Sequence, residues 1–427
     1  MSNPTASNPA ASSGRWPHYT LVLLSIVYVF NFIDRQILVI LQESIKADMG
    51  LSDSQLGLMT GFTFAIFYVS AGIPIARWAD RSNRRNIVSW AIAIWSGMTA
   101  LSGLAQNFWQ MLLARIGVGI GEAGGSPPAH SMISDIYPAH QRGTALAFYT
   151  AAIYVGIMVG YLVGGWVDQN YGWRIAFFVV GIPGIFVALL VRYSIKEPPR
   201  GQHDNAPVGD SVSLKETLKT LKSMRSFVFL AVGSGLASFS SYGSGNFMPS
   251  FLFRSHGMEP ADIGILLAFG AGIGGGIGAF FAGWFADRIG KENKRWYAWI
   301  ACIGQIFAIP LGLLALYSDN MTLIALGIGG STFFGIWYLG PVLAMAQTLV
   351  APNMRAMTSA ILFFILNLIG LGGGPLVAGI MSDMLASTYG TESLRYSLTV
   401  MAFSSVFAAL FFWMGAKYLM EDLKKQS

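Results

Sequence analysis

Two ionisable residues, Arg115 and Glu122, interrupt an otherwise apolar stretch, LLARIGVGIGEAGGSPP at residues 112–128. Seven residues is close to two turns of an α-helix, so both side chains lie on one helix face. A charged side chain at bilayer depth is costly unless it is paired or hydrated, and it marks a functional site by default. The pattern therefore predicts a buried ionic site within a membrane.

Asp34, in the segment NFIDR, is the comparable acid deep in another apolar stretch. We expect it to be the main partner of Arg115 and to meet Glu122 in the same cluster. One guanidinium and two carboxylates leave an excess negative charge, which in a poorly solvated cavity favours protonation of one carboxylate. We expect Glu122 to be that acid. Proton arrival would then weaken a pairing and let two parts of the protein move.

Other interpretations of these residues stay open at this point. A static buried salt bridge that fixes one helix against another explains the same cluster, with little net gain in stability. Arg35 points about 100° away from Asp34 on a helix, where it contacts a substrate head group or extends toward the membrane surface. His130 either relays protons or is a structural histidine whose hydrogen bonds are satisfied.

The composition indicates the class of protein. The chain of 427 residues is 54% hydrophobic and 11% charged, whereas a soluble domain carries about 25% charged residues. We therefore expect a protein that crosses the membrane many times. The net charge of +6 comes from basic residues gathered in a few loops, which is typical of cytoplasmic loops and not of nucleic-acid binding. The single cysteine excludes an internal disulfide.

Twelve stretches approach the roughly 20 apolar residues that a span needs, and they divide six and six. The sequence thus predicts an all-α membrane protein with two six-helix bundles, at residues 19–194 and 226–421. Residues 1–18 and 422–427 are expected to be cytoplasmic tails, the first of them disordered and not a signal peptide. Residues 195–225 form the cytoplasmic linker between the bundles.

The linker contains SLKETLKTLKSM, in which leucines occur at positions 214, 218 and 221. This spacing predicts a short amphipathic helix, either on the membrane surface or as a solvated linker helix. If both termini are cytoplasmic, 21 of the 27 Lys and Arg residues fall in cytoplasmic segments. This bias predicts a multi-pass protein of the inner (plasma) membrane with both termini inside.

The two halves repeat each other. ARWADRSNRR at 76–85 corresponds to GWFADRIGK at 283–291, and each follows the second span of its half. Asp80 and Asp287 are 207 residues apart, and Arg142 and Arg355 are 213 apart. These similar offsets indicate a duplicated six-helix unit, as in transporters that bind substrate near mid-bilayer between their halves.

GWFADRIGK resembles the signature loop of the major facilitator superfamily, G-x-x-x-D-[RK]-x-G-[RK]-[RK]. Glu292 replaces the last basic residue, and the first copy departs at Ala76 and Asn83. The resemblance implies that Asp80 meets the start of the eleventh span and Asp287 the start of the fifth. A carboxylate there accepts hydrogen bonds from the first amides of a helix.

These contacts would close the cytoplasmic side, with Arg84 or Arg85 pairing with Asp135. The alternative is a solvated charged turn that only anchors the topology. The expected cytoplasmic gate comprises the residues Asp80, Arg81, Arg84, Arg85, Asp135, Arg142, Asp287, Arg288 and Arg355.

NFIDR (31–35), ARIGVGIGEA (114–123) and SDIYPAHQRGTALAFY (134–149) together resemble the Spinster branch of that superfamily. Its members are similar to sphingosine-1-phosphate and lysophospholipid transporters in animals. The resemblance implies a proton-coupled secondary transporter that moves a lipid-like or amphipathic, anionic substrate by alternating access. In this fold the first, fourth, seventh and tenth spans line the cavity. The candidate substrate-binding residues are Arg35, Arg115, Tyr242, Asn246, Trp337 and Asn367, several of which could instead be packing residues.

Two alternatives remain. A proton-driven drug efflux pump or organic-anion transporter would share these features, and a membrane-embedded lipid enzyme belongs to another class. The sequence lacks a nucleophile–base pair at membrane depth, a Cys/His metal cluster and a G-x-x-x-x-G-K-[ST] loop. We therefore expect a monomer that is not an enzyme and has no metal or cofactor. Its partners are a small-molecule or lipid substrate, protons and the bilayer, and no nucleic acid.

Overall fold

The computed structural model describes residues 15–201 and 213–424, and these residues form helices and connecting turns without strands. In the first half the helices are α1 (Arg15–Ile40), α2 (Gln42–Met49), α3 (Asp53–Gly57), η1 (Leu58–Phe62), α4 (Thr63–Arg81), α5 (Arg84–Ser102), α6 (Phe108–Glu122), α7 (Ser126–Ile136), α8 (Ala139–Tyr171) and α9 (Trp173–Ser194). The linker contains α10 (Leu214–Ser223).

The second half contains α11 (Arg225–His256), α12 (Pro260–Leu267), η2 (Ala268–Ile273), α13 (Gly274–Ile289), α14 (Trp296–Tyr317), α15 (Met321–Gly335), η3 (Ile336–Tyr338), α16 (Leu339–Thr348), η4 (Pro352–Met354), α17 (Arg355–Ile365), η5 (Leu366–Gly373), α18 (Gly374–Tyr389), η6 (Gly390–Glu392) and α19 (Ser393–Lys424). Where consecutive pieces continue one another, they combine into long spans. The described chain then forms twelve of them.

Both the composition and the helical architecture indicate a membrane protein. Eight helical stretches are long and apolar enough to cross a bilayer, and one of them, Pro352–Lys424, includes the last two spans. The spans outside this set are α5, α6 with α7, and α11, which carry charged or serine-rich turns. The predicted fold class, two six-helix bundles of membrane-spanning helices, is confirmed.

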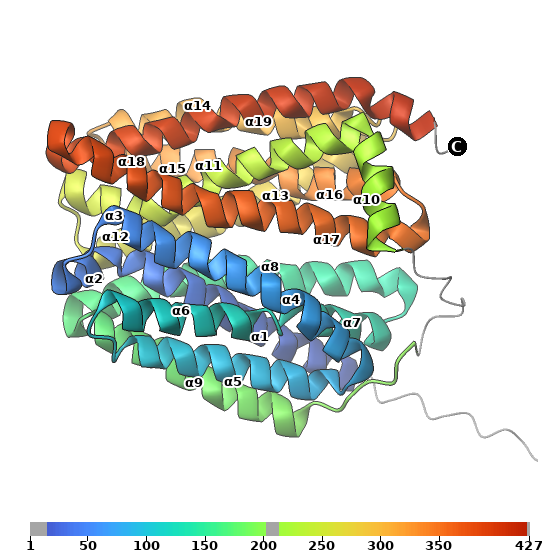
Figure 1. Cartoon of the computed structure of the whole chain (residues 1–427), viewed down its shortest axis with the longest axis horizontal. Coiled ribbons are helices and arrows are strands. Elements are labelled where there is room, and N and C mark those ends of the chain that lie inside the picture. Colours follow the sequence, from blue (N-terminus) through green and yellow to red (C-terminus); the bar gives the residue numbers. More distant parts are fainter. Residues whose placement is uncertain (1–14, 202–212, 425–427) are drawn as a thin grey trace, which may run out of the picture.

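Figure 1 shows the two bundles side by side, with the first half in blue to green and the second in yellow-green to red. They meet along the second and eleventh spans, where α3 packs against α18 and η1 against η5. They also meet along the fifth and eighth spans, where α8 packs against α12 and η2. Gly57 permits this approach, because a Cβ atom there would collide with the main chain of Pro375.

The boundaries of the halves differ from the expected ones at both chain ends. Residues 15–18 belong to α1, not to a tail, because Trp16 packs against the core of the first bundle. At the other end α19 continues to Lys424, and Asp422 is 1% exposed. Its carboxylate accepts hydrogen bonds from the amide and hydroxyl of Ser226, at the start of α11. The rest of the expected tails, 1–14 and 425–427, lies outside the described residues.

Two spans are interrupted at equivalent places of the repeat. The fourth span breaks at residues 123–125, between α6 and α7, and the tenth becomes a 3₁₀ turn at Ile336–Tyr338. The offset between 123 and 336 equals the one between Arg142 and Arg355. The first break follows from Pro127 and Pro128, which occupy the first turn of α7 and cannot continue a helix from α6.

Candidate functional site

The structure brings the three predicted ionisable residues together inside the first bundle. Asp34 is 0% exposed, Arg115 2% and Glu122 1%. Arg115 donates from Nη1 to the main-chain carbonyl of Asp34 at 3.3 Å. Glycines make the packing possible, since a Cβ at Gly119 would touch the main chain of α4 at 3.1 Å.

The pairing within this cluster differs from the expected one. Glu122 accepts a hydrogen bond from Nε of Arg35 at 2.7 Å, so its ion-pair partner is Arg35. The Arg35 guanidinium lies over the rings of Phe64 and Tyr68, at 5.0 and 5.2 Å. A long arginine side chain can bridge the 100° that separates it from Asp34 on the helix, and these rings hold it against Glu122.

The presence of Arg35 changes the charge balance. Two guanidiniums now face two carboxylates, so the four ionised side chains of the ionic cluster, Asp34, Arg35, Arg115 and Glu122, sum to zero. Among the described residues, no hydrogen-bond partner is found for either carboxylate oxygen of Asp34, although both are buried. Glu122 has a charged partner, whereas Asp34 contacts Arg115 through its main chain only.

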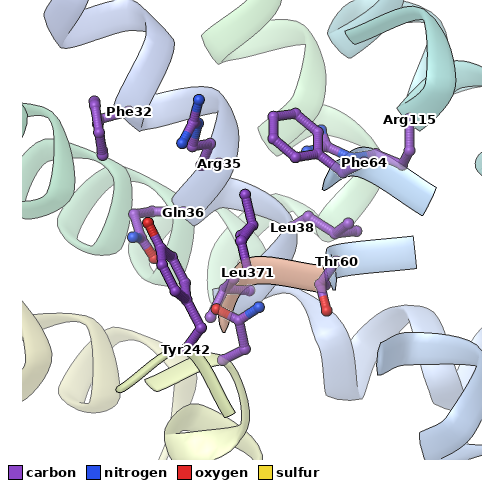
Figure 2. A pocket seen from close by; sticks show the side chains of 11 residues that line it. Phe32, Arg35, Gln36, Leu38, Thr60, Phe64, Arg115, Tyr242 and Leu371 are labelled. Atoms are coloured by element: carbon purple, nitrogen blue, oxygen red, sulfur yellow. The ribbon is translucent and has the colours of Figure 1, made fainter. Parts of the chain in front are cut away.

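The two arginines of the ionic cluster, Arg35 and Arg115, line a pocket between the halves, shown in Figure 2. Tyr242 extends from α11 of the second half toward Arg35 and Gln36 of α1. The pocket is lined by Phe32, Arg35, Gln36, Leu38, Val39, Thr60, Phe64, Arg115, Tyr242, Asn246 and Leu371. Charged, amide and hydroxyl groups thus share the pocket with aromatic and aliphatic side chains, which suits an amphipathic ligand.

Four of the six expected substrate-binding residues line this pocket: Arg35, Arg115, Tyr242 and Asn246. Trp337 and Asn367 do not. Trp337 packs among aromatic rings of the second half, with Phe334 at 5.0 Å and Phe333 at 5.6 Å.

The structure also shows where Asn367, His130 and Gln36 lie relative to the pocket. Asn367 is half-buried in η5, away from the pocket lining. His130 lies on α7 with its ring edge against Tyr149 at 5.2 Å. Gln36 lines the pocket although the sequence analysis did not select it.

The expected gate residues lie on the side where α1 begins and α19 ends, called here the termini side. Asp80 and Asp287 are exposed, and Asp287 accepts a hydrogen bond from Tyr297 of its own half at 3.0 Å. Asp80 forms no ion pair within the described residues. Arg81, Arg288 and Arg355 are exposed as well. In this conformation neither aspartate caps the helix that the resemblance assigns to it.

Within the first half the gate residues do form a network. Arg84 is 1% exposed and pairs with Asp135 and, at 2.8 Å, with Glu197. The amide of Arg85 donates to Glu197 at 2.9 Å. Arg142 donates to the carbonyl of Tyr137 at 3.0 Å. Arg200, in the segment that follows α9, donates to the carbonyl of Ala79 at 2.6 Å, so this segment ties the second, third and fourth spans together.

On the opposite side, sequence analysis missed an ionic connection between the halves. Arg254, near the end of α11, donates to Glu43 at 2.6 and 3.0 Å and to Asp53 at 2.7 Å from two nitrogens. Asp53 also accepts from Lys46 at 2.5 Å and from Ser382 at 2.6 Å. Arg254 and Lys46 are two of the six basic residues outside the expected cytoplasmic segments. This position is the one feature of the sequence that could have indicated the ionic connection.

A second connection on this side involves a helix terminus. Asp383 of α18 accepts hydrogen bonds from the amides of Asp53 and Ser54, at 3.0 and 2.8 Å, at the start of α3. A carboxylate of the eleventh span thus caps the start of the second span. The signature loop implies the same kind of contact on the termini side, with the roles of the two spans exchanged. We call Glu43, Asp53, Arg254 and Asp383 the latch; it holds the halves together on the side opposite the termini.

Comparisons with known proteins identify the family of this chain. The model of the Major Facilitator Superfamily matches residues 24–375. An MFS-type efflux pump of Mycolicibacterium smegmatis is 32% identical, over 95% of this chain and 94% of its own length. The sphingosine-1-phosphate transporter SPNS2 of Danio rerio is 27% identical, over 96% and 86%.

A solved bacterial homologue of the human lysosomal transporter Spinster, in an inward-facing and unoccupied conformation, is 31% identical. It superposes with a TM-score of 0.87 over 96% of this chain and 99% of its own. A solved bacterial Spinster homologue in an inward-facing and occupied conformation gives a TM-score of 0.84. This chain therefore belongs to the major facilitator superfamily, in its Spinster branch, and is a multi-pass membrane transporter.

Proposed function

We propose that this transporter moves a lipid-like or amphipathic anion by alternating access, coupled to protons that bind at Asp34. The supporting observation is the ionic cluster at the pocket wall. It balances two guanidiniums against two carboxylates, and one of these carboxylates, that of Asp34, forms no hydrogen bond or ion pair with a side chain of the described residues. A buried carboxylate without an ion-pair partner is the more readily protonated one.

The charge balance suggests how proton and substrate are coupled. When Asp34 is ionised, the cluster is neutral and attracts an anion weakly. When Asp34 binds a proton, Arg115 keeps its charge while its neighbouring carboxylate loses it, so the pocket wall becomes positive. An anionic head group then binds near Arg115 and Arg35, and its apolar part lies against Phe32, Phe64 and Leu371. Proton and anion thus favour the same state.

This assignment revises the expectation that Glu122 is the titrating acid. Glu122 pairs with Arg35 at 2.7 Å, and loss of its charge would leave Arg35 unpaired in a buried place. In the present proposal Glu122 instead holds Arg35 in position at the pocket, and Asp34 carries the proton.

We propose that the protein lies in the inner (plasma) membrane with both termini in the cytoplasm, as the distribution of Lys and Arg favours. The latch side is then extracytoplasmic, and the conformation described here is inward-facing. The protein works as a monomer in this proposal, because both walls of the pocket come from one chain.

The proposed coupling is tested by the pH dependence of substrate binding to purified protein, with lysophospholipids and anionic amphiphiles as probes. Wild-type affinity should fall as the pH rises and Asp34 loses its proton. Asp34→Asn should keep the low-pH affinity at every pH, because the amide imitates the protonated acid. Glu122→Gln should retain the pH dependence. If Glu122→Gln loses it and Asp34→Asn keeps it, Glu122 is the proton carrier.

A second candidate function is proton-driven efflux of small molecules. It is favoured by the 32% identity with an MFS-type efflux pump over nearly the whole chain. The two candidates share the ionic cluster and differ in the cargo. Uptake by proteoliposomes under an imposed pH gradient, screened with lipids and with small organic ions, distinguishes them.

A further inference from the structure

The linker helix α10 is anchored to the second half by one face only. Its start is capped by Ser213, whose hydroxyl accepts from the amide of Glu216 at 3.2 Å. Thr217 and Leu221 are 0% and 1% exposed, and they pack against α11 and α17. The helix is therefore a fixed part of the second bundle, not a free linker segment.

The remaining surface of α10 combines apolar and basic side chains. Leu214 is 50% exposed, and Lys215, Lys219 and Lys222 are exposed along one stripe at positions i, i+4 and i+7. None of the three lysines forms an ion pair with a carboxylate of the described residues. Glu216 is the one acid that the sequence of α10 contains.

α10 lies at the end of the bundle where the spanning helices reach the membrane surface. Figure 1 shows α10 crossing the ends of the spanning helices on the termini side, so its axis runs along the plane of the bilayer surface. A leucine beside a row of lysines suits the boundary between acyl chains and head groups: the leucine enters the apolar layer and the lysines extend to the phosphates.

We infer that the exposed face of α10, formed by Leu214, Lys215, Lys219 and Lys222, is a binding surface for anionic phospholipid head groups of the adjoining leaflet. The argument is charge complementarity: three ammonium groups in one stripe, without an ion-pair partner among the described residues, match a surface of phosphate diesters that carry a net negative charge. With the orientation proposed above, this is the cytoplasmic leaflet.

This surface is connected to the gate. α10 packs on α17, which begins at Arg355, and the resemblance assigns this helix start to Asp80 as its partner. Lipid bound along α10 restrains the start of α17 and so acts on the closing of the termini side.

The test measures the depth of a nitroxide at Leu214→Cys in full-length protein whose Cys302 is replaced by Ala. The protein is reconstituted in phosphatidylcholine vesicles with or without about one third phosphatidylglycerol. We expect phosphatidylglycerol to raise the accessibility of the label to oxygen and lower its accessibility to a nickel chelate severalfold. This shift should disappear in Lys215→Gln/Lys219→Gln/Lys222→Gln.

The matched control, Lys196→Gln/Lys291→Gln/Lys417→Gln, removes three exposed lysines of the same side from other elements and should keep the shift. An unchanged label depth on addition of phosphatidylglycerol would overturn the inference, because the helix then faces water or another partner. An equal response of both triple variants would also overturn it, since bulk charge and not α10 would then explain the effect. Neither readout depends on the transported substrate, so failure here is separate from failure of the proposed function.

Discussion

At the scale of single residues, the identity of a buried acid's partner decides what the acid can do. Asp34 and Glu122 are equally buried, but the carboxylate of Glu122 pairs with a guanidinium, whereas the guanidinium of Arg115 donates to the main-chain carbonyl of Asp34. Spacing along the sequence predicts that Arg115 and Glu122 share a helix face. It cannot predict that Arg35 turns toward Glu122, because this depends on the rings of Phe64 and Tyr68, which come from another span.

Removal of Arg35 should reveal how strongly this pair is held. In Arg35→Ala the charge of Glu122 stays buried without its partner, which costs about 3 kcal/mol. The double variant Arg35→Ala/Glu122→Gln should recover part of that loss, since no unpaired charge remains. The measurement is the unfolding midpoint of purified protein in denaturant.

The control for this cycle is Arg174→Ala, which breaks an exposed pair with Asp48. The two side chains of that pair are 40% and 43% exposed, so its loss should cost less than about 1 kcal/mol. Equal destabilisation by Arg35→Ala and Arg174→Ala would contradict the view that the Arg35–Glu122 pair is energetically isolated from solvent.

At the scale of helices, the sequence predicts the number of spans and their order from runs of apolar residues. It predicts less well where a span is interrupted, because a glycine or proline signals only that a break is permitted. Pro127 and Pro128 do mark the break after Glu122. The capping of α3 by Asp383 has no local signal, since the two segments are more than 300 residues apart in sequence.

This cap joins the halves, so its removal should act on conformation. In Asp383→Ala the first amides of α3 lose acceptors supplied by the second half, and the latch side should open more often. Spin labels on either side of the latch should then show a longer distance in a larger fraction of molecules. Ser52→Ala removes the cap that α3 receives from its own half, so it should lower helix stability by about 1 kcal/mol without separating the halves. Equal separation in both variants would contradict the proposal.

At the scale of the whole molecule, two sets of contacts compete for the relative position of the bundles. The latch is formed in this conformation, whereas Asp80 and Asp287 are exposed on the termini side. The internal repeat explains why the two sets resemble each other. The second and eleventh spans meet at the latch end, and at the other end the same two spans offer a carboxylate, Asp80, and a helix start, Arg355, which are both exposed in this conformation. Breaking the latch and weakening the closure of the termini side should therefore move the population of conformations in opposite directions.

Arg254→Gln leaves Glu43 and Asp53 facing each other without the guanidinium between them, so it should favour opening of the latch side. Asp80→Asn weakens the opposite closure and should favour the conformation described here. If each change is worth about 1.4 kcal/mol, it moves the ratio of the two states about tenfold. Their combination should return the ratio toward the wild-type value, because the two energies act on one equilibrium with opposite sign. Paired spin labels across the second and eleventh spans, at both ends, measure all four proteins. A shift of the same sign in both single variants would mean that the two ends do not compete for one equilibrium.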